Sequence, residues 1–199
     1  PWEGFGNRYL AKPDPAGKNR GSPFVFAVGG GKPAIDLDHY FHASCGGERP
    51  DFVTFLLGIN DCFSANPEDP AAVDARIDAM FGHADKLVTA FRKAVPGADL
   101  GICLTTPPNA RESGFEANYH GKYHRWGWKR IQHRLVEREL EHFGGRESER
   151  IFLVPTELNL DPVDGYPENN GVHPNAVGYR QIGASIFAWI KSRLESPRR

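Results

Sequence analysis

The sequence is poor in cysteine, in long apolar runs and in excess charge of either sign. Its three cysteines show no C-x-x-C or other metal-ligand spacing, and their odd number excludes a disulfide framework that pairs all of them. The sequence leaves undecided whether two of the cysteines form a disulfide beside one free thiol. It also leaves the cellular compartment undecided. No apolar run reaches the ~18 residues that a membrane-spanning helix needs. The net charge of −1 supplies no strong field that favours nucleic acid or an anionic membrane as a partner.

What is present fits one globular domain. The 199 residues predict a single domain over 1–199, and a hydrophobic content of 40% is enough for one sizeable core. The chain opens at Pro1 with neither an initiating methionine nor a signal peptide. We therefore expect it to be a piece of a longer protein.

Short apolar runs alternate with longer amphipathic patterns. The runs are strand-sized and continuous, which suits strands covered on both faces, as in a parallel sheet. They lie at 24–28, 52–57, 99–104 and 151–154. Apolar residues at three- and four-residue steps predict helices. These lie at 36–43, 70–95, 126–143 and 174–194. The alternation predicts an α/β fold with a parallel sheet between helices.

Two long stretches, 1–23 and 105–126, are irregular. The second follows a predicted strand, and ligands of open α/β sheets bind at the carboxyl ends of strands. We therefore expect it to wall a cleft, with aromatic side chains that stack on a sugar ring or pack on an acyl chain, although at least half of them suit the core. The aromatic residues are Phe115, Tyr119, Tyr123, Trp126 and Trp128.

The first chemical motif is Leu57-Gly58-Ile59-Asn60-Asp61, where a predicted strand ends. Asn60 is neutral and offers two N–H donors, which suits a developing oxyanion. Ordinary turn chemistry explains the same Asn-Asp pair.

The second motif is Asn170-Gly171-Val172-His173-Pro174-Asn175, followed by Gly178-Tyr179, just before the last predicted helix. Pro174 favours an extended His173 and can open the helix. An imidazole held there can serve as a general base. A surface histidine is the simpler interpretation of His173 taken alone.

Taken together, the two motifs resemble the SGNH (GDSL-type) hydrolase superfamily, over the whole chain from Pro1 to Arg199. The resemblance implies a flavodoxin-like three-layer α/β/α sandwich with a central parallel sheet. It implies ester hydrolysis with no metal and no cofactor. By this resemblance Asn60 matches the oxyanion asparagine and His173 the base that activates serine.

The same resemblance implies a glycine whose N–H also binds the oxyanion. Gly6, in Trp2-Glu3-Gly4-Phe5-Gly6-Asn7, is the better match to the glycine-bearing block, although Asn7 stands where relatives often have a second glycine. Gly30, in the triple glycine 29–31, competes with Gly6, although a flexible loop is the slightly better interpretation of that triple glycine.

The chain departs from the family pattern at two points. No Gly-Asp-Ser occurs, so the nucleophilic serine and its strand belong upstream of Pro1 or on a separate fragment. Ser44 and Cys45 lie in an ordinary helix-end pattern and do not replace it. The acid expected three residues before the histidine is Asn170, which can orient the imidazole but cannot stabilise its charge. Asp161, Asp164 or a backbone carbonyl are the alternatives.

The resulting hypothesis is a serine esterase acting on a small-molecule or carbohydrate ester, with no nucleic-acid partner and no membrane span. The resemblance slightly favours a secreted or periplasmic protein. A non-catalytic binding module of the same fold is the main alternative, favoured by the missing serine and by Asn170. A nucleotide-binding protein is weaker, because only 29–32 resembles a phosphate-cradling loop.

Overall fold

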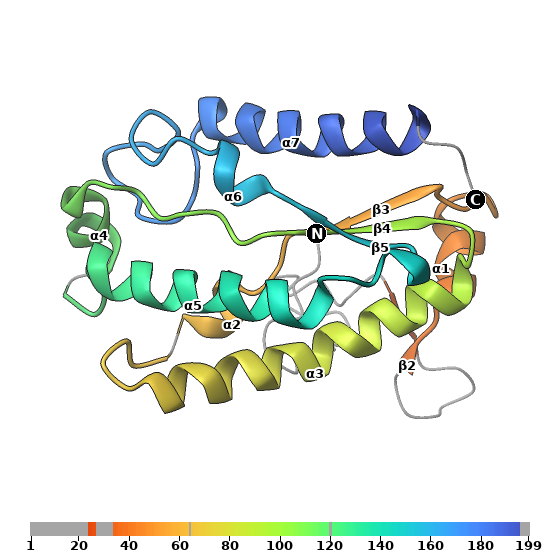
Figure 1. Cartoon of the computed structure of the whole chain (residues 1–199), viewed down its shortest axis with the longest axis horizontal. Helices are drawn as coiled ribbons and strands as arrows, with labels where there is room; N and C mark the ends of the chain where they lie inside the picture. The colour runs from red at the N-terminus through yellow and green to blue at the C-terminus, as the bar shows by residue number, and fades with distance from the viewer. Residues whose placement is uncertain (1–23, 27–33, 64, 120, 196–199) are drawn as a thin grey trace. The chain divides into compact units, whose positions relative to one another are not determined.

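The computed structural model of the chain describes residues 24–26, 34–63, 65–119 and 121–195 (Figure 1). They belong to two compact units, one within Pro1–Asp51 and Asp78–Ala98, the other within Phe52–Ile77 and Asp99–Arg199. Helix α3, Pro70–Ala94, contributes residues to both.

The first unit contains a small antiparallel pair of strands. Strand β1, Val25–Phe26, pairs antiparallel with β2, Ala34–Ile35. The expectation that this apolar run joins the parallel sheet is therefore wrong for Val25–Phe26. The reason is local: a partner strand follows a few residues later, and a short sequence separation makes this pairing cheap in chain entropy.

Helix α1, Leu37–Ser44, follows in the same unit, one residue later than predicted at each end. Asp36 caps it by accepting the N–H of His39. Arg49 then donates to the carbonyl of Ala94 at 2.6 Å and to Asp38 at 2.7 Å, which ties α1 to the end of α3.

The second unit is built on a parallel sheet. Its strands are β3, Phe52–Phe55, β4, Asp99–Cys103, and β5, Ile151–Val154, in the order β3-β4-β5. All neighbours are parallel, with Phe52 opposite Asp99 and Leu100 opposite Ile151. Such a sequential order matches the last three strands of a flavodoxin-like sheet.

Helices cover both faces of this sheet. Helix α7, Ala176–Glu195, lies on one face and α5, Arg125–Phe143, on the other (Figure 1). On the α7 face, Trp189 packs with Cys103 and Val154. The predicted three-layer α/β/α arrangement with a central parallel sheet is confirmed.

The sequence predicts α1 and the long helices closely and misses three short α-helices among the described residues. The expected ranges 70–95, 126–143 and 174–194 match α3, α5 and α7 to within two residues. The stretch 105–126 is not irregular throughout, because α4, Glu112–Tyr119, lies inside it. Only Gly114 and Phe115 of α4 are buried, so no apolar stripe marks it. The two other short α-helices are α2, Ile59–Cys62, and α6, Thr156–Asn159.

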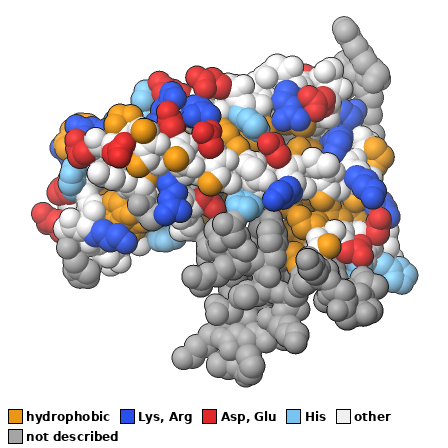
Figure 2. Space-filling model, turned by 90° about the horizontal axis from the view of Figure 1, so that it is seen from below, with side chains coloured by type: hydrophobic (Ala, Val, Ile, Leu, Met, Phe, Trp, Pro, Cys, Tyr) orange, Lys and Arg blue, Asp and Glu red, His pale blue; other side chains and the backbone are white. Residues whose placement is uncertain are grey.

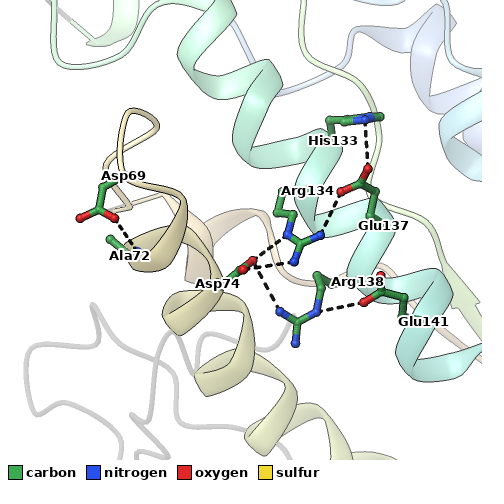
Figure 3. A network of polar contacts seen from close by, with 8 residues as sticks. All are labelled: Asp69, Ala72, Asp74, His133, Arg134, Glu137, Arg138 and Glu141. Carbon is green, nitrogen blue, oxygen red and sulfur yellow. Dashed lines mark hydrogen bonds and ion pairs between the residues drawn. The ribbon is translucent and has the colours of Figure 1, made fainter.

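Charged side chains join α3 to α5. Arg134 contacts both carboxylate oxygens of Asp74, at 2.7 and 3.1 Å, and Arg138 lies 3.5 Å from the same group (Figure 3). These hydrogen bonds, chiefly from Arg134, lower the pKa of the Asp74 carboxyl. Acidic and basic side chains are interspersed over the described part of the face in Figure 2, as a net charge near zero leads one to expect.

Asp99 anchors the amino end of β4. It is 3% exposed and lies 2.6 Å from Arg150, which precedes β5, and 3.0 Å from Arg193 near the end of α7. A buried carboxylate needs such paired charges. The contact also shows that α7 runs antiparallel to the strands.

The three cysteines are free, so the disulfide left open by the sequence does not form. Burial raises the pKa of both Cys62 and Cys103 to about 12. Within the described residues, none of the helices combines the length and apolar character needed to cross a bilayer.

We predict that Gly101→Ala destabilises the second unit. An added Cβ would lie 2.9 Å from both Trp189 and Val154, so the sheet and α7 would have to separate. Overpacking of this kind costs about 1–3 kcal/mol in the free energy of unfolding, measurable by urea denaturation. Gly183→Ala, on the open side of α7 with nothing within 4 Å, is the control and should be neutral or stabilising. Equal stability of the two variants would contradict the prediction.

Candidate active site

Two of the predicted site residues, Asn60 and His173, lie on segments that leave or approach the carboxyl edge of the parallel sheet. Strand β3 leads directly into α2, which carries Asn60. Helix α7 ends beside Asp99 at the amino end of β4, so it begins at the opposite, carboxyl edge, and His173 precedes its first residue by three positions (Figure 1). Both residues belong to one compact unit, with α2 on the α5 side of the sheet and α7 on the other side (Figure 1). Among the described residues, no hydrogen bond joins the two side chains.

Asn60 is presented on a sharp turn. Gly58 has a φ of 109°, a conformation that favours glycine, and its carbonyl accepts the N–H of Cys62 at 3.0 Å. Cys62 is completely buried, whereas Asn60 is exposed. The turn thus anchors one side of α2 and leaves the Asn60 amide facing outward.

His173 lies on a loop, residues 161–175, which we call the His173 loop. The side-chain oxygen of Asn170 accepts the backbone N–H groups of Val172 at 3.0 Å and His173 at 2.8 Å. Asn170 thus holds the backbone at His173, and the imidazole is exposed. The two residues are brought together, and the contact is between the Asn170 side chain and the His173 main chain.

Of the alternative acids, Asp161 has a turn-forming role. Its Oδ1 accepts the N–H of Val163 at 2.7 Å and that of Asp164 at 3.0 Å. These two backbone bonds lower the pKa of the Asp161 carboxyl. Asp164 is exposed, and its carbonyl accepts the side-chain amide of Asn175.

The structure explains the spacing of Asn175 and Gly178 in the histidine motif. Asn175 Oδ1 accepts the N–H groups of Val177 at 2.8 Å and Gly178 at 3.1 Å, which caps the start of α7. Gly178 must lack a side chain, because a Cβ there would lie 2.3 Å from the carbonyl oxygen of Gly165. Gly178 of the motif therefore allows the first turn of α7 to pack directly against the backbone of the loop at Gly165.

Sequence reasoning missed Asn109, which holds the same loop from the sheet side. Asn109 is completely buried, and its Nδ2 donates to the carbonyls of Pro167 and Asn170, each at 2.9 Å. Its own N–H donates to the carbonyl of Gly171. One signal in the sequence could have pointed to Asn109. It ends the segment Thr105-Thr106-Pro107-Pro108-Asn109, which directly follows a buried strand.

A buried carboxyl group lies beneath this edge. Glu139 of α5 is 3% exposed and accepts the N–H and hydroxyl of Thr105, at 2.9 and 2.8 Å. Burial raises the pKa of Glu139 to about 7, although the bonds from Thr105 act in the opposite direction. Thr105, just after β4, is thus bonded to a carboxyl group whose pKa lies near neutrality.

The aromatic residues expected to wall a cleft are mostly core. Phe115, Tyr123 and Trp128 are buried, and Tyr119 is partly buried. Burial raises the pKa of the Tyr119 and Tyr123 hydroxyls. Trp126 is the exception at 55% exposure, with Arg125 over its ring at 4.5 Å.

Gly6 and Gly30, the two candidates for the backbone oxyanion donor, lie outside the described residues, as does 29–32. Among the residues that are described, no group of three or more His, Cys, Asp or Glu side chains is placed to hold a metal ion.

No family model matches this sequence, and no curated protein matches it. Two solved structures share part of its fold. One, from Streptococcus pneumonia, is provisionally named a platelet activating factor; it has a TM-score of 0.44 and 18% identity, over 72% of this chain and 61% of that one. The other, provisionally named a GDSL-like lipase from Parabacteroides merdae, has a TM-score of 0.41 and 16% identity, over 76% of this chain and 65% of that one.

The chain spans less than two thirds of the length of either structure. The likeness concerns the course of the backbone and assigns no role to any residue of this chain.

We predict that Glu139→Gln removes a pH dependence of stability. The folded protein favours neutral Glu139, so its contribution is fully present below its ordinary pKa of 4.5 and is lost as the pH rises through about 7. Glutamine stays neutral and can still bond Thr105. As the pH rises from 5 to 8, the free energy of unfolding of the variant should therefore increase relative to that of the wild type. The expected change in this difference is on the order of 1–3 kcal/mol.

Urea denaturation at several pH values measures this difference. Glu141→Gln, which changes an exposed carboxylate of the same helix that is paired with Arg138, is the matched control. Wild-type and Glu139→Gln curves that stay parallel from pH 5 to pH 8 would refute the assignment.

Proposed function

We propose that this chain is the asparagine- and histidine-bearing part of a serine ester hydrolase. The observation that supports it most is that Asn60 follows the carboxyl end of β3, while His173 precedes α7, which begins at that same end of the sheet. This edge is where open α/β sheets bind their ligands. The SGNH-type motifs that contain both residues give the chemistry.

In the proposed reaction a serine outside this chain attacks the carbonyl carbon of an ester. His173 accepts the serine proton as the C–O bond forms, and then gives it to the departing alcohol. Asn60 and a backbone N–H, from Gly6 or Gly30, donate to the oxyanion. Water, deprotonated by His173, then releases the acid and restores the serine.

The contacts of Asn170 and Asp161 favour a Ser–His pair over a triad completed by either of these two side chains. The side-chain oxygen of Asn170 already accepts two backbone N–H groups, and so does Oδ1 of Asp161. We therefore propose that backbone bonding fixes the His173 loop in place and that no carboxylate is needed to hold the imidazole. Trp126, exposed near the start of α5, favours an ester with a ring that stacks on indole, such as an acylated sugar.

The first test is His173→Ala in the full-length protein, with p-nitrophenyl acetate as substrate. Loss of the base should lower kcat by at least about 100-fold. His133→Ala, on the exposed side of α5, is the control and should retain activity. Equal turnover by both variants would remove His173 from the mechanism, and no turnover by any of the proteins would favour the non-catalytic binding module.

The second test is Asn60→Ala in the same assay. Removing one oxyanion donor should lower kcat by about 100- to 1,000-fold and leave KM nearly unchanged. Asn66→Ala is the control, because Asn66 is a nearby exposed asparagine that accepts the N–H of Glu68 within a turn. A rise in KM at constant kcat would instead assign Asn60 to ground-state binding.

A further inference from the structure

We propose that Asn109 is a positioning residue that fixes the His173 loop on the sheet, and that through this loop it sets the place of the imidazole. The proposal rests on the proposed function for the role of His173. The contacts that carry it involve only the main chain and the buried amide.

The side-chain amide and the backbone N–H of Asn109 donate all their hydrogen bonds to the His173 loop. Its Nδ2 bonds Pro167 and Asn170, and its N–H bonds Gly171, while its side-chain oxygen accepts the N–H of Arg111. An asparagine amide has two N–H donors and one carbonyl acceptor, so each part has a partner. The bonds span 58 to 62 positions of sequence and cannot arise from local turn formation.

The path from Asn109 to His173 is short. Asn109 Nδ2 bonds the carbonyl of Asn170, and the side chain of Asn170 accepts the N–H of His173. A displacement of the Asn109 amide therefore reaches the His173 main chain through one residue. This path also gives Asn170 a purpose in the place where the family carries its acid.

Close packing prevents the amide from shifting. A Cβ on Gly114 of α4 would lie 2.9 Å from Asn109 Nδ2 and 2.9 Å from the carbonyl of Asn170. A Cβ on Gly171 would lie 2.8 Å from the ring of Phe115. Helix α4 thus closes over the contact, and only glycine fits on either side of it.

The segment that leads from β4 to Asn109 is also held by hydrogen bonds. Thr105 is bonded by Glu139 and by Gln132, and the carbonyl of Leu104 accepts the Thr156 hydroxyl at 2.5 Å. These buried bonds fix the chain between the end of β4 and Asn109. The loop is therefore attached close to an end of β4 that buried hydrogen bonds hold in place.

Asn109→Asp tests the proposal by hydrogen exchange on the whole chain. A carboxylate there would face two carbonyl oxygens and donate to neither. We expect the amides of Val172 and His173 to exchange at least about 10-fold faster, while the core amides of α5 change by less than about 2-fold. Asn118→Asp is the control, since Asn118 also donates to a loop carbonyl, that of Asn169, but from an exposed position.

Two results would overturn the proposal. One is unchanged exchange at Val172 and His173; the other is an equal acceleration in α5, which would make Asn109 a general stability residue. If Asn109→Asp does not fold, Asn109→Ala decides the same question, because it removes the two Nδ2 hydrogen bonds without burying a charge. Asn118→Ala is its control.

Kinetics separates this proposal from the proposed function. In the active full-length protein, Asn109→Asp should lower kcat at least about 10-fold with KM nearly constant, and it should add little to His173→Ala. Full additivity with His173→Ala would overturn the proposal. If the wild type hydrolyses no ester, the proposed function fails, while the exchange experiment still tests whether Asn109 holds the loop.

Discussion

The end of β4 imposes the constraint on which the second unit depends. The strand is buried along its whole length, so the main chain that leaves it at Leu104 and Thr105 is still inside the protein. Buried N–H and C=O groups must find partners there. Side chains from α5 and α6 supply them: Glu139 and Gln132 bond Thr105, and Thr156 bonds Leu104. The sheet, α5 and α6 are thereby locked together at the edge where a ligand would bind.

The loop before α7 takes its conformation from the same edge. Asn109, a few residues beyond β4, bonds three positions of the loop, and Tyr166 of the loop donates to the carbonyl of Pro107. At its other end the loop is joined to α7 by the Asn175 cap and by the close approach of Gly165 and Gly178. His173 is therefore exposed on a segment whose main chain is held on both sides, a suitable support for a proton-transferring group.

Two buried carboxyl groups lie at opposite ends of the sheet and have different surroundings. At the amino end, Asp99 is matched by Arg150 and Arg193, and the pairing offsets the cost of burial. At the carboxyl end, Glu139 is bonded by Thr105, whose groups carry no charge, and burial raises its pKa to about 7. The amino end is thus held by paired charges, whereas the carboxyl end rests on a carboxyl group whose pKa lies near neutrality. Perturbed carboxyl groups of this kind cluster near functional sites.

The sequence by itself determined the α/β class, the parallel sheet, the long helices and the motifs around Asn60 and His173, because periodicity and capping are local properties. It missed α4, which has too few buried residues to leave a pattern, and it misassigned Val25–Phe26, because composition does not reveal a strand's partner. Tertiary structure alone decided that Asn109 holds the His173 loop. The Asn109 contacts join residues as many as 62 positions apart, and only folding brings them within hydrogen-bonding distance. The bonds of Asn170 to the main chain are local, but which backbone groups its side chain accepts is seen only in the structure.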